Sequence, residues 1–466
     1  MPTKCPQKQV KISEIAVTND KISGRGGLFF IIRYIENIQF YSLFYKMFGY
    51  IKTAAKGLTC QQFIKQMLAH FIDGSDMAMT AFDRHKHDVA YAALLDNRPD
   101  EMASSHQIKR FFNKLRLCPQ RLFRRLLLEL FIWRLHIEQP SIITLFVDSK
   151  VLDNNDAHKR EGVECTYKNK NGFQPLHICW GRYIVDALFR EGNVHGNHGN
   201  DVTRAITRLT LAIRKRYRDV PIIVTSDSAF MDDDNFSDFE NKLGIFYVCA
   251  GKQYDELKQY VEAINPDQFD TYTNDHQTWH YLEFGNRLNT WSTFRRCLYT
   301  TPMTDEHGQL LLSFAKRDQF VYTNIGIDPK LTDKLVAAGG ADYINAAKII
   351  ALNHSRGAGE LTHRSHVDFL TKEQLPFERF GMNRAYYYLS VFGHFLYEAY
   401  KHDVTHDIIP ATCYPTTFRR RLVDFAAKVV SSGGRFTLKV VQSVYDGLKL
   451  ETVWERIAVP KPIPVT

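Results

Sequence analysis

Two apolar, β-prone runs that each end on an aspartate place the strongest constraint on the fold of this 466-residue chain. Residues 142–147 read IITLFV and lead into Asp148, and residues 221–226 read PIIVTS and lead into Asp227. Runs of this length and composition are typical of buried strands. An acid at the carboxyl end of such a strand faces the crevice in which α/β sheets place their sites. The two runs therefore predict an α/β domain with a carboxylate-lined site.

The segments between and after these runs predict how that domain is ordered. After the first run come strand-like stretches at 174–180 and 183–190 and then a helical pattern at about 201–217. The second run is followed by a short helical pattern at about 234–242 and a strand-like stretch at 245–250. Three strands, a helix, a strand, a helix and a strand is the order of a ribonuclease-H-like α/β core.

The remaining segments predict an arrangement of helical and β-rich parts around the core. Apolar residues at spacings of three and four predict helices over 28–138, where Thr59 caps a helix at 60–71 and Gly74 ends it. The stretches TWHYLEFG, TFRRCLYTT, QLLLSFAK and QFVYTNIG predict short strands of a β-rich insertion. Helices are predicted again from 341 to 400 and beyond, with a strand at 435–441. The predicted parts are a helical N-terminal domain (1–139), the first part of the core (140–265), the β-rich insertion (266–330), the second part of the core (331–400) and a helical C-terminal region (401–466).

The positive charge of the chain is concentrated at its N-terminal end. The net charge is +9, and residues 1–140 contain 21 Lys and Arg against 12 Asp and Glu, so the rest of the chain is neutral. A hydrophobic content of 44% excludes a disordered chain. The surplus favours a nucleic-acid-binding module, although a basic surface without a partner remains an alternative.

Two short helical patterns in this basic region resemble a helix-turn-helix. They span 87–95 and 104–115 and are joined by a turn that contains Asn97-Arg98-Pro99-Asp100. The second helix and the one after it carry the cations that we expect to contact DNA phosphates: Lys109, Arg110, Lys114, Arg116, Arg121, Arg124 and Arg125. The alternative is that these cations only solvate a helix face.

A third acid, Glu360, lies in a predicted helix within the stretch NHSRGAGELTHRSH. Arg356, Glu360 and Arg364 are spaced i, i+4 and i+8, so they share one helix face. Three acids that converge from two strands and a helix would form an oxygen-ligand site for two Mg²⁺ ions, with Mn²⁺ as a substitute. The basic neighbours would hold phosphates or orient the carboxylate. Each acid taken alone is also compatible with a structural role, as a turn cap or as one partner of a surface salt bridge.

Other classes of protein have weaker support in the sequence. The eight cysteines are scattered without a CxxC pair, which argues against a disulfide framework or a zinc-finger array. Histidine groups at 85–87, 195–198 and 354–366 raise a zinc hydrolase as a rival, but none has a metal-site spacing with a matching partner. The N-terminus has no signal-peptide pattern and no transmembrane run is visible, so we expect a cytoplasmic, nucleoid-associated protein without membrane contact.

The order and context of these motifs resemble a DDE transposase of a bacterial insertion sequence, in the branch with a β-strand insertion before the Glu. Asp148 and Asp227 are 79 residues apart, and Asp227 and Glu360 are 133 apart, with the β-rich segment in the longer gap. The stretches FVDSKVLD, YKNKNGFQPLHICWG, VTSDSAF and IFYVCAGK resemble core strands of that family. FREGNVHGN resembles its Arg-x-Gly-Asn-x-His connection, and RGAGE resembles the Arg-x-x-x-Glu part of its signature.

The resemblance implies that Asp148, Asp227 and Glu360 bind two divalent metal ions. Water and then the freed 3′-hydroxyl would attack phosphodiesters at the element ends and in target DNA, with a homodimer pairing the terminal inverted repeats. Trp279 and Trp291 would stack on a base or, alternatively, pack in the core.

The sequence departs from the family signature at two places. Asn353 replaces a Tyr and Val367 replaces a Lys, so Arg364 or His366 would grip the phosphate in place of that Lys. Gly359, directly before Glu360, marks a kink or a close approach. The rival readings are an inactive DNA-binding relic and a ribonuclease-H-like nuclease without strand transfer.

Overall fold

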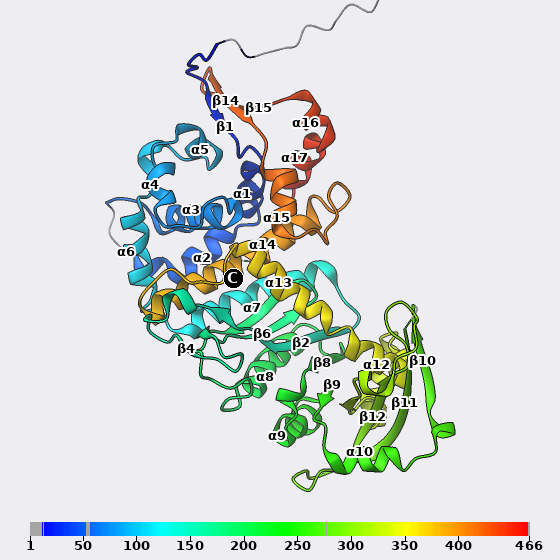
Figure 1. Cartoon of the computed structure of the whole chain (residues 1–466). Helices are drawn as coiled ribbons and strands as arrows, with labels where there is room; N and C mark the ends of the chain where they lie inside the picture. Colours follow the sequence, from blue (N-terminus) through cyan, green and yellow to red (C-terminus); the bar gives the residue numbers. More distant parts are fainter. Residues whose placement is uncertain (1–11, 13, 53–55, 276, 465–466) are drawn as a thin grey trace, which may run out of the picture.

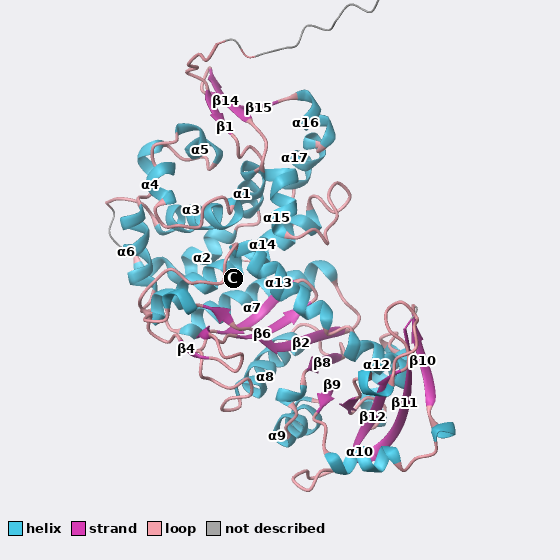
Figure 2. Ribbon diagram, viewed as in Figure 1, coloured by secondary structure: helices cyan, strands magenta, loops and turns pink. Residues whose placement is uncertain are grey.

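The structure is a computed structural model that describes residues 12, 14–52, 56–275 and 277–464. It is a mixed α/β protein in which a helical body lies against one end of a large sheet (Figures 1 and 2). The insertion forms the opposite end of that sheet, on the far side from the helical body. The sheet lies between these two parts and positions the candidate site.

The large sheet has nine strands that combine the core and the insertion. In spatial order these are β10 (Asp270–Asn274), β11 (Gln277–Asn286), β12 (Arg295–Pro302), β13 (Gln319–Thr323), β9 (Phe246–Gly251), β8 (Ile222–Ser226), β2 (Ile143–Ser149), β6 (Leu176–Trp180) and β7 (Tyr183–Leu188). Strands β2, β8 and β9 run parallel, whereas β6 is antiparallel to β2 and β13 is antiparallel to β9. The insertion strands therefore extend the core sheet rather than forming a separate one.

Most predicted strands are present, with one correction in the insertion. The stretch QLLLSFAK contains only an isolated bridge between Thr304 and Leu310 and a 3₁₀ turn at Ser313–Ala315. Leu310 and Leu312 are exposed, so nothing packs against this apolar stretch to hold it in the sheet. A small sheet that was not predicted lies beside the core and consists of β3 (Leu152–Asp153), β5 (Asn171–Phe173) and β4 (Glu164–Cys165).

The helices of the core and insertion lie between and after these strands. They are α8 (Asp201–Arg214), α9 (Asp233–Ser237) with a π-helical continuation at Asp238–Leu243, α10 (Asp255–Glu262), α11 (Pro329–Ala337), α12 (Ala346–His354) and α13 (Gly357–Leu370). Helix α12 packs on β9, and α13 packs on β6. Since α13 carries Glu360, its contact with the sheet decides where that acid lies.

The helical body combines segments from both ends of the chain. The N-terminal helices are α1 (Leu28–Asn37), α2 (Phe40–Phe48), α3 (Cys60–Asp73), α4 (Ala81–His85), α5 (Val89–Leu94), α6 (Ser105–Leu115) and α7 (Gln120–Glu138). The C-terminal ones are α14 (Phe380–Asp403), α15 (Pro415–Phe418), α16 (Gln442–Gly447) and α17 (Leu450–Ala458). Helix α3 has the predicted Thr59 cap and ends at Gly74, which has a left-handed φ of 61°. Buried side chains of the body and of the core sheet form one continuous cluster, and the domain boundaries stay a prediction.

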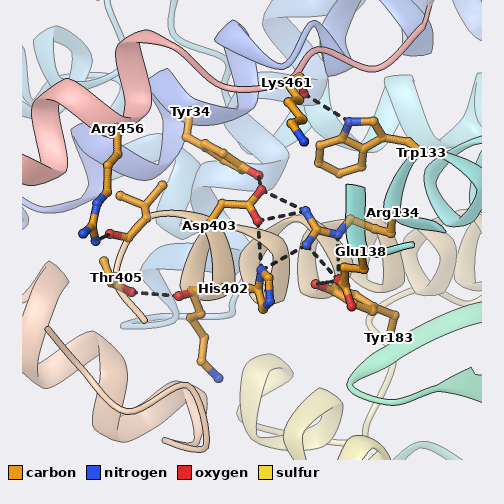
Figure 3. Close-up of polar contacts among 12 residues, drawn as sticks. Tyr34, Trp133, Arg134, Glu138, Tyr183, His402, Asp403, Thr405, Arg456 and Lys461 are labelled. Carbon is orange, nitrogen blue, oxygen red and sulfur yellow. Dashed lines mark hydrogen bonds and ion pairs between the residues drawn. The ribbon is translucent and has the colours of Figure 1, made fainter. Parts of the chain in front are cut away.

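A buried arginine joins the two ends of the chain inside this body (Figure 3). The guanidinium of Arg134 on α7 donates to Asp403 at the end of α14 and to Glu138. The Tyr34 hydroxyl on α1 donates to the same Asp403 carboxylate at 2.6 Å, and the Trp133 indole donates to the carbonyl of Lys461 at 3.1 Å. Because the arginine is fully buried, loss of its partners would leave an uncompensated charge.

A three-stranded sheet corrects the expectation that the N-terminal region is all helical and that the C-terminal region is helical apart from one strand. It consists of β1 (Lys21–Ser23), β14 (Ala427–Ser432) and β15 (Arg435–Val440), and only the last of these was predicted. Lys21 pairs with Val429, so the two strands are 408 residues apart in the chain. Strand β1 has only three residues, and a pattern that short cannot indicate a partner so far away.

Among the helices of the described residues, none has the length and apolar character needed to cross a membrane.

Candidate active site

Strand register brings Asp148 and Asp227 together at one edge of the sheet. Val147 of β2 is paired with Ser226 of β8 in parallel register, and each aspartate is the next residue along its strand. Both aspartates line one pocket of about 420 Å³. The carboxyl ends of parallel strands meet at the same sheet edge, so the sheet itself sets this pair.

Asp148 is positioned by the alternation of side chains along β2. Ile143, Leu145 and Val147 are buried, while Phe146 and Asp148 lie on the other face, with 23% of the Asp148 side chain exposed. The carboxylate of Asp148 accepts a hydrogen bond from the Ser149 amide at 2.6 Å. Its other oxygen lies 3.5 Å from Nδ1 of His363, a contact that the sequence did not predict.

Asp227 caps the turn that follows β8. Its carboxylate accepts a hydrogen bond from the Ala229 amide at 2.8 Å, as the cap of a 3₁₀ turn at Ser228–Phe230. Burial raises the pKa of the Asp227 carboxyl, the Ala229 hydrogen bond lowers it, the Asp148 charge raises it and the Arg356 charge lowers it. The balance is upward, and burial is its largest cause.

A buried arginine ties the loop on the far side of this pocket to β2. Arg190, 7% exposed, donates from Nη1 to the carbonyls of His195 and Gly196 and from Nη2 to the Ser149 hydroxyl at 3.1 Å. This gives the Arg of the FREGNVHGN stretch a physical role, because it fixes the loop beside Asp148. Tyr167 lies on the pocket wall, where burial and then the charges of Asp148 and Asp227 raise the pKa of its hydroxyl. Sequence reasoning missed Tyr167, since only its strand-like neighbourhood was visible.

Glu360 lies in a different cavity from the aspartate pair. It is exposed in the first turn of α13 and lines a cleft of about 940 Å³ between that helix and the insertion. In the described part of the chain, no three His, Cys, Asp or Glu side chains are grouped in a way that would hold a metal ion. The structure therefore brings together two of the three predicted acids, and the third lies in the neighbouring helix α13 and lines a separate cleft.

A glycine allows α13 to dock closely on β2. A Cβ atom on Gly359 would lie only 2.0 Å from the ring of Phe146, so no larger residue fits without movement. Phe146 is two residues before Asp148, and His363, one turn further along α13, reaches Asp148 itself. Of the two explanations for this glycine, the structure shows the close approach.

The larger cleft contains the predicted residues of the Glu helix and one tryptophan. Trp279, 9% exposed, stacks on Tyr272 with ring centroids 5.4 Å apart and also contacts His354. Nη1 of Arg356 donates to Asn353 at 3.4 Å, and the Asn353 amide donates to Gln319 of β13. Asn353 thus links the Glu helix to the insertion at the place where the family signature has a Tyr.

Three residues that were predicted to contact DNA contact other protein side chains instead. His366 is 1% exposed, and its Nε2 is hydrogen-bonded to Ser390 at 3.0 Å. Trp291 is buried against Phe236 and Tyr322, with Arg295 over its ring. Arg124 forms two hydrogen bonds with the fully buried carboxylate of Asp186, at 2.9 and 2.7 Å. In this structure His366 and Trp291 pack in the core, which for Trp291 is the alternative that the sequence left open, and Arg124 is held against Asp186 with 16% of its side chain exposed.

The other predicted cations remain at the surface. Helix α6 begins at a capping box formed by Ser104 and Gln107, which confirms the start of the second helix of the predicted pair. Arg116 is half-buried and donates to Asn113. The exposed cations of this region and of the Glu helix are Lys109, Arg110, Lys114, Arg121, Arg125 and Arg364.

Comparison with known proteins identifies the class to which this fold and site belong. The family model of the transposase DDE domain, group 1, matches residues 5–461, so the chain belongs to this family. At the level of the class it is a DNA transposase, an enzyme that cleaves and joins DNA with divalent metal ions, which confirms the resemblance seen in the sequence. No match was found among the curated proteins. A solved structure of a piggyBac transposase synaptic complex with hairpin DNA is similar with a TM-score of 0.41 and 13% identity, over 94% of this chain and 83% of that chain.

Proposed function

We propose that this protein is the transposase of an insertion sequence, which binds terminal inverted repeats and catalyses cleavage and strand transfer. The observation that carries the proposal is the pair of aspartates on adjoining parallel strands. The spatial order β7-β6-β2-β8-β9, in which β6 alone is antiparallel to β2, β8 and β9, supports a ribonuclease-H-like core around that pair. Family membership supports the reaction class.

Asp148, Asp227 and Glu360 are the proposed metal ligands. Carboxylate oxygens are the ligands that Mg²⁺ prefers, and a cation between Asp148 and Asp227 would offset the repulsion between them. Glu360 is the third ligand in the proposal, supported by the contact of its helix with β2 at Gly359. When bound, two Mg²⁺ or Mn²⁺ ions supply activation of an attacking oxygen and stabilisation of the leaving one.

The side chains around the acids are proposed to hold the DNA strand. Nε of Arg356 is a buried donor with no acceptor among the described residues, and Arg356 lines the cleft beside Glu360. A phosphate oxygen in the cleft would satisfy that donor. Arg364 is exposed on the same helix and would contact the next phosphate, while Trp279 with its stacked partner Tyr272 offers a surface for a base.

The exposed cations of α6 and α7 are proposed to hold the element ends through phosphate contacts. Such contacts fix the position of the duplex but carry no base information themselves. Pairing two ends requires two active sites, so the proposal includes a homodimer in the complex that pairs the ends.

A strand-transfer assay tests the proposal against its two rivals. The full-length protein is incubated with Mg²⁺, first with a plasmid that carries the coding region and its flanking DNA, and then with pre-cleaved flank ends and target DNA. Cleavage at both flanks followed by joined products is the expected result. Cleavage without any joined product would favour a nuclease, and flank binding without cleavage would favour an inactive relic.

A further inference from the structure

The hairpin of β14 and β15 extends from the helical body at the end of the molecule farthest from the insertion (Figure 1). Ser432 pairs with Arg435, so the loop consists only of Gly433 and Gly434. Both glycines have left-handed φ values, 58° and 76°, as a two-residue hairpin turn with this twist requires. A Cβ atom on either would meet nothing within 4 Å, so the tip of the hairpin lies free in solvent.

The register of the hairpin places its cations on one face. Directly paired residues share a face, and the pairs Lys428–Lys439 and Ser432–Arg435 are an even number of residues apart along each strand. The adjacent pair Ala427–Val440 lies on the opposite face and packs in the core. The face that carries Lys428, Arg435 and Lys439, here called the basic face, is therefore the one turned to solvent.

The charge of the basic face is largely uncompensated. Residues 427–440 contain no Asp or Glu. Lys428 forms an ion pair with Asp20 at 2.8 Å, but Arg435 and Lys439 are exposed and have no ion-pair partner in the part of the chain that the structure describes. Two free cations on a projecting hairpin with small residues at its tip favour a polyanionic partner.

The position of the hairpin next to α5 favours duplex DNA as that partner. Strands β1 and β14 pack on α5, the first helix of the pair α5–α6 that resembles a helix-turn-helix. The Gly26 amide donates to the Phe425 carbonyl and fastens the two ends of the chain just below the sheet. The hairpin and the helical pair are thus parts of one packed unit. The phosphates of a duplex bound by the pair would therefore be attracted by the cations of the hairpin.

We propose that the β14–β15 hairpin is a second DNA-contacting element, which holds the phosphate backbone through Arg435 and Lys439. Phe436, 72% exposed near the tip, is paired with Ser431 and therefore lies on the opposite face of the hairpin, outside the proposed contact. This inference rests on the proposed function, because it adds a backbone contact to a protein that binds DNA. It places part of the DNA-binding surface in the C-terminal region, where the overall charge balance gave no sign of it.

The salt dependence of DNA binding tests the inference. Full-length wild-type protein and the double variant Arg435→Gln/Lys439→Gln are titrated with a fluorescein-labelled duplex of about 30 bp and arbitrary sequence, because counterion release does not depend on sequence. Loss of two phosphate contacts is expected to lower the slope of log K against log salt concentration by about two and to weaken binding about tenfold at low salt. The variant Arg435→Lys/Lys439→Arg is expected to keep the wild-type slope.

A matched control removes an equal charge far from the hairpin. Lys215 and Arg216 form an exposed pair at the end of α8, and Lys215→Gln/Arg216→Gln is expected to leave the slope unchanged. Thermal unfolding checks that every variant folds, and light scattering reports the oligomeric state.

Three results would overturn the inference. A wild-type slope in Arg435→Gln/Lys439→Gln would refute it alone and leave the proposed function intact. Loss of self-association with an unchanged slope would show that the basic face binds a second copy of the chain instead. No measurable binding of the duplex by the wild-type protein would overturn both the inference and the proposed function.

Discussion

The candidate site has a strand-borne half and a helix-borne half that are held in place in different ways. Asp148 and Asp227 are fixed by the pairing of β2 with β8, and a shift of that register would disrupt the whole sheet. Glu360 depends on how α13 docks on β2, through the close approach of Gly359 to Phe146 and the contact of His363 with Asp148. The difference indicates that the first half is organised before any ligand binds, whereas the second half responds to the position of one helix.

The largest effect is expected from removing the strand-borne acids. Asp148→Asn or Asp227→Asn should lower flank cleavage by about 1,000-fold or more, because several kcal/mol of metal-dependent stabilisation of the transition state is lost. Affinity for duplex DNA should remain within about twofold of the wild-type value, since the phosphate contacts lie elsewhere. Cleavage at the wild-type rate by either variant in Mg²⁺ would exclude that residue from the site.

Glu360→Gln should differ from the aspartate variants in its effect on metal binding. It is expected to abolish cleavage as the aspartate variants do, but to weaken metal binding without DNA by less than about tenfold. The readout is the rise in melting temperature on adding Mn²⁺, which mass action converts to an affinity. Either aspartate variant should lose that rise completely. If Glu360→Gln loses it as well, the three ligands form one preorganised set and the comparison fails.

Two glycines in the first turn of α13 test the docking of the helix-borne half. Gly359→Ala should destabilise the protein by about 1–3 kcal/mol and reduce cleavage, because its Cβ overlaps the Phe146 ring. Gly357→Ala is the matched control, since nothing lies within 4 Å of its Cβ and alanine favours the helix. Thermal unfolding and the cleavage rate are measured for both. Equal effects of the two substitutions would show that the contact with Phe146 does not determine activity.

The smallest effect is expected from pH, and it too should fall on the helix-borne half. Burial lowers the pKa of His366 on α13 to about 3, and it lowers that of His394 on α14 well below the ordinary value. On unfolding, the pKa of each histidine returns to about 6.5, so below that pH the unfolded chain binds protons that the folded chain does not bind. Their contribution to the free energy of unfolding is therefore complete above pH 6.5 and decreases as the pH falls, by about 1.4 kcal/mol per pH unit for His366 down to its folded pKa of about 3, and in the same direction for His394.

Substitution of one buried and one exposed histidine checks this pH dependence. Melting temperatures are compared between pH 7.5 and 5.5 for the wild type, His366→Gln and His106→Gln, whose histidine is exposed on α6. His366→Gln should flatten the acid decline, whereas His106→Gln should not change it. An equal decline in all three would place the acid sensitivity outside the contact between α13 and α14.

The core of the fold could be predicted because its signals are local. The runs at 142–147 and 221–226 combine length, β-branched residues and a terminal acid, and the structure places strands there that differ from the predicted bounds by one or two residues. Thr59 caps its helix as predicted, because a capping residue acts on amides only two or three positions away, and the predicted pattern at 104–115 begins at the residue that caps α6.

The remaining features depend on partners that are distant in the chain. Arg124 and Asp186 are 62 residues apart, and His366 and Ser390 are 24 apart, so nothing near Arg124 or His366 in the sequence indicated these partners. The same limit applies to the Glu360 helix, whose spacing indicated a shared face but not the direction of that face. Trp291 is an aromatic in a β-rich segment, which fits both a stacking surface and a core until its neighbours are known.

The pairing of β1 with β14 has a consequence for how the protein matures. The Ile463 amide donates to the carbonyl of Ile38, so α1 is enclosed by a segment that leaves the ribosome more than 400 residues later. While translation is still in progress, the nascent chain cannot complete the helical body that carries the proposed DNA-contacting helices. A chain that ends before β14 lacks the partner of β1 and cannot form the sheet that packs on α5, so we expect it to lose the packed unit of the hairpin and the helical pair.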